Sequence, residues 1–498
     1  MTFKFSEKQI LWGMILIYVA VFGLITALRH YNFQTQTWDL AAFVQSFWNA
    51  AHGRGLVNSL EQVPNHLGLH FSPFLFLLVP GYVIFQSPYF LLFIQTIAIA
   101  LGAIPLYFLA NRILNKRLLS HVIAIAYLLY PGLQWANMYD FHEITFFIPL
   151  FLAALYFIEV QKFGWAALFL ALSASVKEDA ILAVAFAGIY ALLTAKSHPE
   201  AQSRMNLKRS FTEFILSQSN GFRMTNKSFG ILIIVASVIY FVLAVKVFMP
   251  ALGGGVLRLD RYANLGETPT AVVENIVKNP VILVDTILTK EKATYLFWLF
   301  LPVLFLPFFS WRSLILLLPG LPENLLTNYQ FQFSGLYHYD SILIPGIFVG
   351  AIYGLKNILE KHSMTEKYLK WGFIGVIVGV FLSRSPLGIT SFPVQYFQKN
   401  QQWEDYRQLI RFVPPEISVA ANTNLVPHLA HREIIYQAGL EKDFVEMSIL
   451  DAADLFPFTI KEEMQGYIDY YLATGNYTTN VLKGRYVIIL NNKYKLDY

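Results

Sequence analysis

The chain has 498 residues, of which 56% are hydrophobic and only 14% are charged. Soluble domains carry about 25% charged residues, so this composition excludes an ordinary soluble protein and favours one that lies in a lipid bilayer. The net charge of +5 is small and gives no indication of nucleic-acid binding, and the absence of cysteine excludes disulfide and thiolate chemistry.

The first apolar run, residues 9–28, is predicted to be a retained signal anchor in the cell membrane. It is longer than a signal-peptide core, and no convincing small-residue cleavage site accompanies it. Lys4 and Lys8 precede it, so the positive-inside rule places the N-terminus in the cytoplasm. Residues 30–70 then form an external loop, whose segment 38–49 has apolar residues at helical spacing. This spacing predicts an amphipathic helix that lies on the membrane surface.

The placement of charge predicts about eleven membrane crossings. Residues 71–110 are interrupted by two Pro-containing breaks and must cross only once, so one half is expected to be short, tilted or re-entrant. Further spans are expected at 118–134, 144–160, a hairpin 164–195, 230–249, 294–309, 313–326, 340–356 and 371–385. The basic clusters assigned to the cytoplasm are those at 112–117, 196–228 and 356–370.

Residues 387–498 differ in composition from the transmembrane part, residues 1–386. This tail is predicted to contain a helix at 424–430 and short buried strands at 417–420, 433–436 and 486–490. We therefore expect a mainly α-helical, polytopic transmembrane bundle followed by a small extracytoplasmic α/β domain.

Acidic and histidine side chains gather at the ends of the apolar runs that this topology places outside. Asp39 stands at the membrane boundary, where a carboxylate can deprotonate a hydroxyl or bind a divalent cation. The alternative is an ordinary surface aspartate or a helix N-cap. His66 and His70 have the spacing of a metal-binding pair, but Leu67 stands where a zinc protease needs a glutamate. The sequence thus argues against peptidase chemistry and leaves His70 as a candidate site residue.

Asp140, His142 and Glu143 place three ionisable side chains in four residues at the start of a predicted span. On a helix, Asp140 and Glu143 would share a face and could bind one cation or a phosphate-bound metal. Capping of the following helix is an equally good interpretation.

A second acidic group, Lys177, Glu178 and Asp179, interrupts the apolar hairpin. Ionisable groups near membrane depth indicate function, and Lys177 could bind a phosphate. The alternative is a hairpin tip that stands in water. Further candidates in or beside later external loops are Arg258 and Arg261, which suit phosphate, and His338 and Tyr339.

Six short segments together resemble one family. They are Trp-Asp-Leu-Ala-Ala-Phe-Val-Gln-Ser-Phe-Trp-Asn at 38–49, Ala-His-Gly-Arg-Gly-Leu at 51–56, Leu-Gly-Leu-His-Phe-Ser-Pro at 67–73, Asp-Phe-His-Glu at 140–143, Val-Lys-Glu-Asp at 176–179 and Val-Pro-His-Leu-Ala-His-Arg at 426–432. From about residue 15 to its end, the chain resembles the bacterial and archaeal predicted membrane proteins grouped as domain of unknown function 2079. That family is in turn similar to a distant branch of the GT-C glycosyltransferases.

The resemblance implies a GT-C-like membrane enzyme that takes a sugar from a polyprenyl-phosphate donor, with inversion at the anomeric carbon. The acceptor would be a glycan, a lipid or a protein. In GT-C enzymes an aspartate of the first external loop is essential, and Asp39 holds that position. Asp140 and Glu143 fit the second acidic motif of those enzymes. Leu40 follows Asp39 where a second acid is common, so a magnesium or manganese ion on Asp39, Asp140 and Glu143 and a metal-free general-base mechanism are both admissible.

The resulting hypothesis makes Asp39 the base or a metal ligand at the extracytoplasmic face. The residues expected to bind substrate are His70, His142, Lys177, Glu178, Asp179, Arg258, Arg261, His338 and Tyr339. A non-catalytic membrane scaffold or receptor is the alternative. A transporter is less favoured, because the ionisable groups gather at the outer ends of the spans rather than at mid-membrane.

Overall fold

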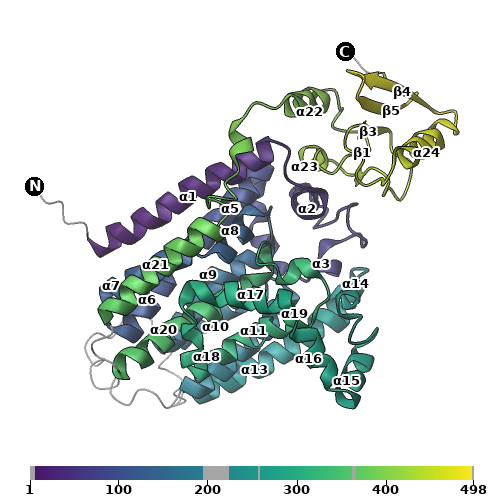
Figure 1. Cartoon of the computed structure of the whole chain (residues 1–498). Helices are drawn as coiled ribbons and strands as arrows, with labels where there is room; N and C mark the ends of the chain where they lie inside the picture. Colours follow the sequence, from purple (N-terminus) through teal and green to yellow (C-terminus); the bar gives the residue numbers. More distant parts are fainter. Residues whose placement is uncertain (1–5, 195–223, 256–257, 362–365, 496–498) are drawn as a thin grey trace, which may run out of the picture.

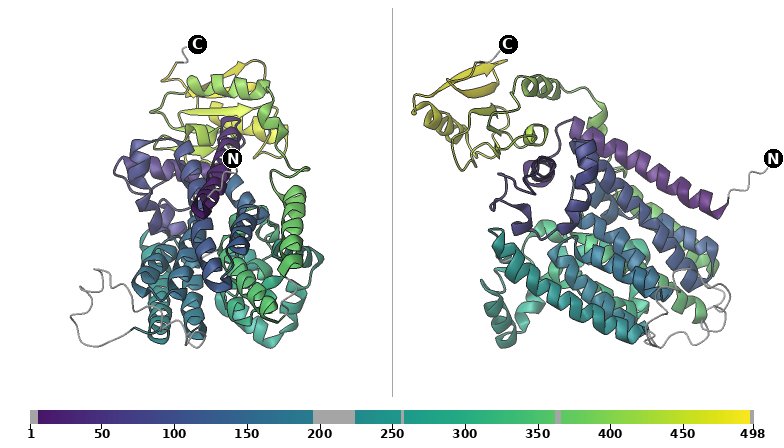
Figure 2. Two further views of the ribbon diagram at one scale, coloured as in Figure 1. Left: turned by 90° about the vertical axis from the view of Figure 1, so that its left-hand side faces the viewer. Right: turned by 180° about the vertical axis from the view of Figure 1, so that it is seen from behind.

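A helical bundle and a smaller α/β domain make up the computed structural model, which describes residues 6–194, 224–255, 258–361 and 366–495 (Figure 1). Figure 2 shows the α/β domain seated at one end of the bundle. The basic loop predicted at 196–228 lies outside the described residues from 196 to 223, and so does 362–365 of the cluster at 356–370.

The first half of the bundle begins with a helix that has a complete capping box. The Ser6 hydroxyl accepts from the Gln9 amide, and the Gln9 side chain accepts from the Ser6 amide. The helices up to residue 194 are α1 (Glu7–Tyr31), α2 (Ala42–Ala51), α3 (His66–Leu69), α4 (Val79–Ile84), α5 (Pro88–Leu101), α6 (Ala103–Leu114), α7 (Arg117–Leu128), α8 (Pro131–Met138), α9 (Phe147–Glu159), α10 (Phe163–Ala174) and α11 (Glu178–Thr194).

The second half of the bundle alternates long helices with short turns. Its α-helices are α13 (Asn226–Leu243), α14 (Met249–Ala251), α15 (Pro269–Lys278), α16 (Val281–Ile287), α17 (Lys290–Phe300), α18 (Trp311–Leu314), α19 (Gly320–Leu326), α20 (Leu343–Lys361) and α21 (Glu366–Arg384). Short π-helical or 3-10 turns that position the site are η1 (Thr37–Ala41), η3 (Glu143–Phe146), η10 (Gln330–Phe333) and η11 (His338–Ile342).

Four helices within the described residues are long and apolar enough to cross a bilayer. They are Glu7–Tyr31, Pro88–Leu114, Asn226–Ala251 and His338–Lys361, and the pair α7 and α8, bent by 41°, makes a fifth if it is one span. The number of about eleven crossings is therefore not confirmed. Within 71–110, the short pieces before Pro88 and one long span after it agree with a single net crossing.

The spans predicted at 294–309 and 313–326 are wrong as continuous helices. Leu304 and Phe305 adopt left-handed backbone angles, with φ of 56° and 53°, between two prolines that cannot donate helical hydrogen bonds. The region is a series of short α-helical and 3-10 segments from α17 to α19. Hydrophobicity alone did not reveal these breaks.

The C-terminal domain contains one five-stranded sheet of order β2-β1-β3-β5-β4. Strands β1, β2 and β3 are parallel, and β5 runs antiparallel to both β3 and β4. The predicted strands and helix correspond to β1, β2, β5 and α23, whereas β3, β4 and two helices escaped prediction. The elements are α22 (Gln401–Arg411), β1 (Val419–Ala421), α23 (Val426–Leu429), β2 (Ile435–Gln437), β3 (Met447–Asp451), α24 (Lys461–Leu472), β4 (Tyr477–Leu482) and β5 (Tyr486–Asn491).

The C-terminal domain packs on the loop that follows α1, over α2 (Figures 1 and 2). The Thr37 and Thr423 hydroxyls are 3.0 Å apart, and the Gln45 amide donates to the Glu433 carbonyl at 2.8 Å. Leu40 and Gln45 are fully buried on this segment. Residues 38–49 are helical, as predicted. The predicted location on the membrane surface is wrong, because other parts of the protein cover the segment.

Helices α11 and α13 approach each other closely at two glycines. A Cβ atom at Gly188 would lie 2.8 Å from the Gly230 carbonyl oxygen, and one at Gly230 would lie 2.6 Å from the Gly188 carbonyl oxygen. Small residues permit such close backbone contact between membrane helices. This contact fixes α11, which carries Glu178 and Asp179 in its first turn.

We expect Gly230→Val to destabilise the protein by about 2 kcal/mol, because the added side chain forces α11 and α13 apart. The measurement is the thermal unfolding midpoint in nanodiscs. Gly379→Val is the matched control, since a Cβ there meets no atom within 4 Å. Equal midpoints for the two variants would contradict the close contact.

Candidate active site

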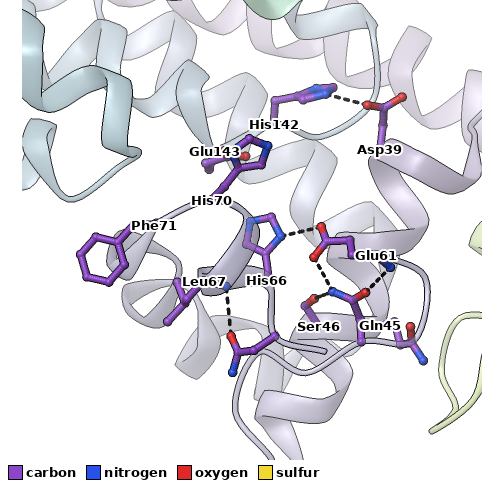
Figure 3. A network of polar contacts seen from close by, with 12 residues as sticks. Asp39, Gln45, Ser46, Glu61, His66, Leu67, His70, Phe71, His142 and Glu143 are labelled. Carbon is purple, nitrogen blue, oxygen red and sulfur yellow. Dashed lines mark hydrogen bonds and ion pairs between the residues drawn. The ribbon is translucent and has the colours of Figure 1, made fainter. Parts of the chain in front are cut away.

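Asp39 and His142 form the centre of the candidate site. Asp39 lies in the π-helical turn η1, and its Oδ1 accepts a hydrogen bond from His142 Nε2 at 2.9 Å (Figure 3). Burial raises the pKa of Asp39, but His142, Tyr139 and Arg29 together outweigh burial through hydrogen bonds and charge, so the pKa is lowered overall. Asp39 caps no helix, since η1 begins after Gln36 and has no side-chain cap. The site therefore presents an ionised carboxylate.

Two imidazole rings stack beside this carboxylate. The centroids of the His142 and His338 rings are 3.7 Å apart, with 23° between their planes. His142 precedes η3, and its backbone amide donates to Gln95 Oε1 at 2.7 Å, which fixes the chain at that point. The Nδ1 atoms of both rings are buried and have no hydrogen-bond partner among the described residues.

Asp140 pairs with a buried arginine rather than with His142. Its Oδ1 lies 2.7 Å from Arg29 Nη1, and its Oδ2 accepts from the Gln36 amide at 2.9 Å. The φ angle of Asp140 is 52°, a left-handed conformation that costs free energy for a residue with a side chain. The hypothesis that Asp140 and Glu143 share a helix face is wrong, because this backbone turn ends the helical path before η3.

Glu143 instead belongs to a second charged group at the tip of the hairpin. Lys177 Nζ lies 3.7 Å from Glu143 Oε1 and 4.0 Å from Asp179 Oδ2. His70 Nδ1 lies 2.9 Å from Glu178 Oε1, whose other oxygen accepts from a backbone amide. Lys177 and Glu178 are largely buried, so the alternative of a hairpin tip standing in water is wrong.

A cavity of about 740 Å³ opens beside this charged group. Its apolar lining includes Leu182, Phe241 and Leu326. The predicted substrate-binding residues that line it are His70, Lys177, Glu178, Asp179, Arg258, Arg261, His338 and Tyr339. His142, Asp39, Asp140 and Glu143 are not among the lining residues. His338 thus stands between the cavity on one side and the His142–Asp39 pair on the other.

Sequence reasoning missed several residues that belong to this site. Glu323 lines the cavity. It is the single acid in the apolar stretch 313–326, and an ionisable residue inside such a stretch indicates function, so the sequence could have revealed it. Glu61 Oε1 lies 2.7 Å from His66 Nδ1, which explains His66 without a metal (Figure 3). Burial lowers the pKa of His66, but Glu61 outweighs it and raises the pKa overall. No sequence signal marked Glu61.

The expectation of one divalent cation on Asp39, Asp140 and Glu143 does not fit this arrangement. Each carboxylate is directed to a different partner: His142, Arg29 and Lys177, respectively. In the part of the chain that the structure describes, no three His, Asp or Glu side chains are grouped so that they could hold a metal ion.

Comparison with known proteins identifies a family. A sequence model described as "Predicted membrane protein (DUF2079)" matches residues 29–480. ArnT from Cupriavidus metallidurans bound to undecaprenyl phosphate is 10% identical, with a TM-score of 0.45 over 96% of this chain and 98% of that chain. The apo state of the same protein is also 10% identical, with a TM-score of 0.42 over 96% and 97%. Likeness at this level is too low to establish a common fold. No curated protein matches the chain.

We expect Asp140→Asn to destabilise the protein by about 3 kcal/mol, because it leaves the Arg29 charge buried without a counter-charge. The thermal midpoint in nanodiscs measures this loss. Asp39→Asn is the matched control, since its amide oxygen can still accept from His142, and its midpoint should change little. Asp39→Asn and Asp140→Asn should therefore differ. If both lower the midpoint equally, Asp140 has no special structural role.

Proposed function

We propose that this chain, which belongs to the DUF2079 family of predicted membrane proteins, is a glycosyltransferase that uses a polyprenyl-phosphate sugar. The observation that carries the proposal is the 740 Å³ cavity, which joins an apolar wall to cationic side chains. It is lined by His338, whose ring stacks on that of His142, the partner of Asp39. A lipid-linked donor needs both an apolar channel and phosphate ligands. In this proposal the cavity end of the bundle is the extracytoplasmic end, and the N-terminus is cytoplasmic.

The donor phosphate would bind the arginines of the cavity rather than Lys177. Lys177 already lies within 4.0 Å of two carboxylates, so its charge is compensated. Among the described residues, neither Arg258 nor Arg261 forms an ion pair with a carboxylate, and both line the cavity. Guanidinium groups bind phosphate in a bidentate manner. Lys177 would then serve to hold Glu143 and Asp179 in place.

Asp39 would act as the general base. The acceptor oxygen forms a bond to the anomeric carbon as the bond from that carbon to the phosphate oxygen breaks. The phosphate leaves with the electron pair, and the hydroxyl proton passes to Asp39. Attack opposite the leaving phosphate inverts the anomeric carbon. His142 keeps the Asp39 carboxylate ionised and oriented, which is what a base at the boundary of a membrane requires.

We expect Asp39→Asn to abolish sugar transfer while donor binding survives, because the amide keeps the shape but cannot take the proton. The measurement uses protein in nanodiscs with a panel of radiolabelled polyprenyl-phosphate sugars for turnover, and undecaprenyl phosphate alone for binding. Arg258→Ala and Arg261→Ala should each weaken lipid-phosphate binding about tenfold.

The matched control for the arginine variants is Arg411→Ala, an exposed arginine at the end of α22 in the C-terminal domain. It should bind undecaprenyl phosphate as the unchanged protein does. Transfer by Asp39→Asn near the wild-type rate would refute the role of Asp39. Failure of every lipid phosphate to bind would refute the glycosyltransferase itself.

The pH dependence of transfer follows from the lowered pKa of Asp39. A carboxylate with a lowered pKa stays ionised above that value and loses its charge only as the pH falls through it. Protonation of Asp39 should therefore cause no loss of kcat/KM between about pH 8 and pH 5. An acid limb with its midpoint near pH 6 in the pH–rate profile would show that another group is the base.

A further inference from the structure

Five aromatic rings form a continuous series next to the site, which we name the aromatic strip: Tyr139, Tyr337, Phe331, Tyr329 and Tyr339. Ring centroids are 4.4 Å apart for Tyr139 and Tyr337, and 5.3 Å apart for Tyr337 and Phe331. They are 5.1 Å apart for Phe331 and Tyr329, and 6.2 Å apart for Tyr329 and Tyr339. Tyr339 also lies 6.4 Å from Tyr337, so the series curves back on itself. Four of the rings come from the segment around η10 and η11, and Tyr139 follows α8.

The aromatic strip connects the two halves of the site. At one end, Tyr339 lines the cavity, and the Arg261 guanidinium lies 4.5 Å from the Tyr329 centroid and 5.4 Å from the Tyr339 centroid. At the other end, Tyr139 is a direct neighbour of Asp39, and its ring is 5.8 Å from that of His142. The strip therefore runs from the proposed donor phosphate site to the proposed base.

The aromatic strip is open on part of its surface. Phe331 is 40% exposed and Tyr329 is 37% exposed, and the other three rings are half-buried. Exposed polar residues, Asn328 and Gln330, alternate with Tyr329 and Phe331 along the chain. Rings that merely anchor a protein in lipid need no such alternation, and lipid contact would leave these amides without water.

Rings interleaved with amides match the chemistry of a sugar chain. One face of a pyranose ring carries C–H groups, which pack on an aromatic ring, whereas its hydroxyl groups need hydrogen-bond partners at the edge. A lipid acceptor would need a continuous apolar groove. Asp39 has a side chain that is 18% exposed, so a hydroxyl held at the Tyr139 end can reach its carboxylate.

We propose that the aromatic strip is the acceptor site and that the acceptor is a carbohydrate chain. This proposal rests on the proposed function and names its acceptor. The sugar unit at Tyr139 supplies the hydroxyl oxygen that bonds to the anomeric carbon of the donor, and its proton goes to Asp39. The remaining rings hold the following units and thereby determine which hydroxyl is placed at the base.

The test measures binding of three hexasaccharides, chitohexaose, maltohexaose and mannohexaose, to the full-length protein in nanodiscs by saturation-transfer NMR titration. We expect at least one to bind. Phe331→Ala and Tyr337→Ala should weaken that binding about fivefold or more, through loss of stacking. Tyr337→Phe keeps the ring and should bind within about twofold of the unchanged protein. Matched controls are Tyr368→Ala in α21 and Tyr470→Ala in α24, exposed rings outside the strip, which should bind normally.

Two outcomes would overturn the proposal: no binding of any of the three hexasaccharides, or equal binding by Phe331→Ala, Tyr337→Ala and the controls. Undecaprenyl phosphate binding is measured on the same preparations. It tests the donor site independently of the strip, and a variant that binds this lipid normally is folded. Normal lipid-phosphate binding without saccharide binding refutes the strip and leaves the proposed function standing. Saccharide binding that depends on Phe331 and Tyr337, without lipid-phosphate binding, refutes the donor assignment and supports the strip.

Discussion

A buried ion pair between Arg29 and Asp140 joins the end of the first membrane helix to the loop that carries His142. The second oxygen of the same carboxylate accepts the backbone amide of Gln36, which directly precedes the turn that carries Asp39. One side chain therefore positions both partners of the Asp39–His142 hydrogen bond. Its left-handed backbone is tolerated because these two contacts offset the strain. The motif of Asp140 suggests a catalytic acid, but its contacts show that it positions the other residues of the site.

The stacked histidines lie between the cavity and the proposed base. His338 lines the cavity, and its ring stacks on that of His142, which binds Asp39. In the proposed reaction the donor approaches from the cavity side of this ring pair and the acceptor from the Asp39 side, along the aromatic strip.

The sequence identified most of the polar residues of the site but not their pairing. Asp39 and His142 were recognised as candidates in separate motifs, yet their contact spans 103 residues and depends on the turn at Asp140, which no periodicity reveals. The broken helices between α17 and α19 were predicted as spans because apolar composition dominated over the prolines. The helix at 38–49 was predicted at the membrane surface because its periodicity cannot show that a distant domain covers it. Glu61 was not identified because no motif marks its contacts with His66 and Asn58.

The packing of the C-terminal domain on the loop after α1 imposes an order on biogenesis. Thr37 and Gln45 are made early, but their partners, Thr423 and Glu433, lie 386 and 388 residues later in the chain. Contacts of such long sequence separation form late and expose the earlier segment while synthesis continues. Thr37 and Gln45 therefore stay uncovered until Thr423 and Glu433 have been made, and a ribosome that stops before them leaves this loop without its C-terminal cover.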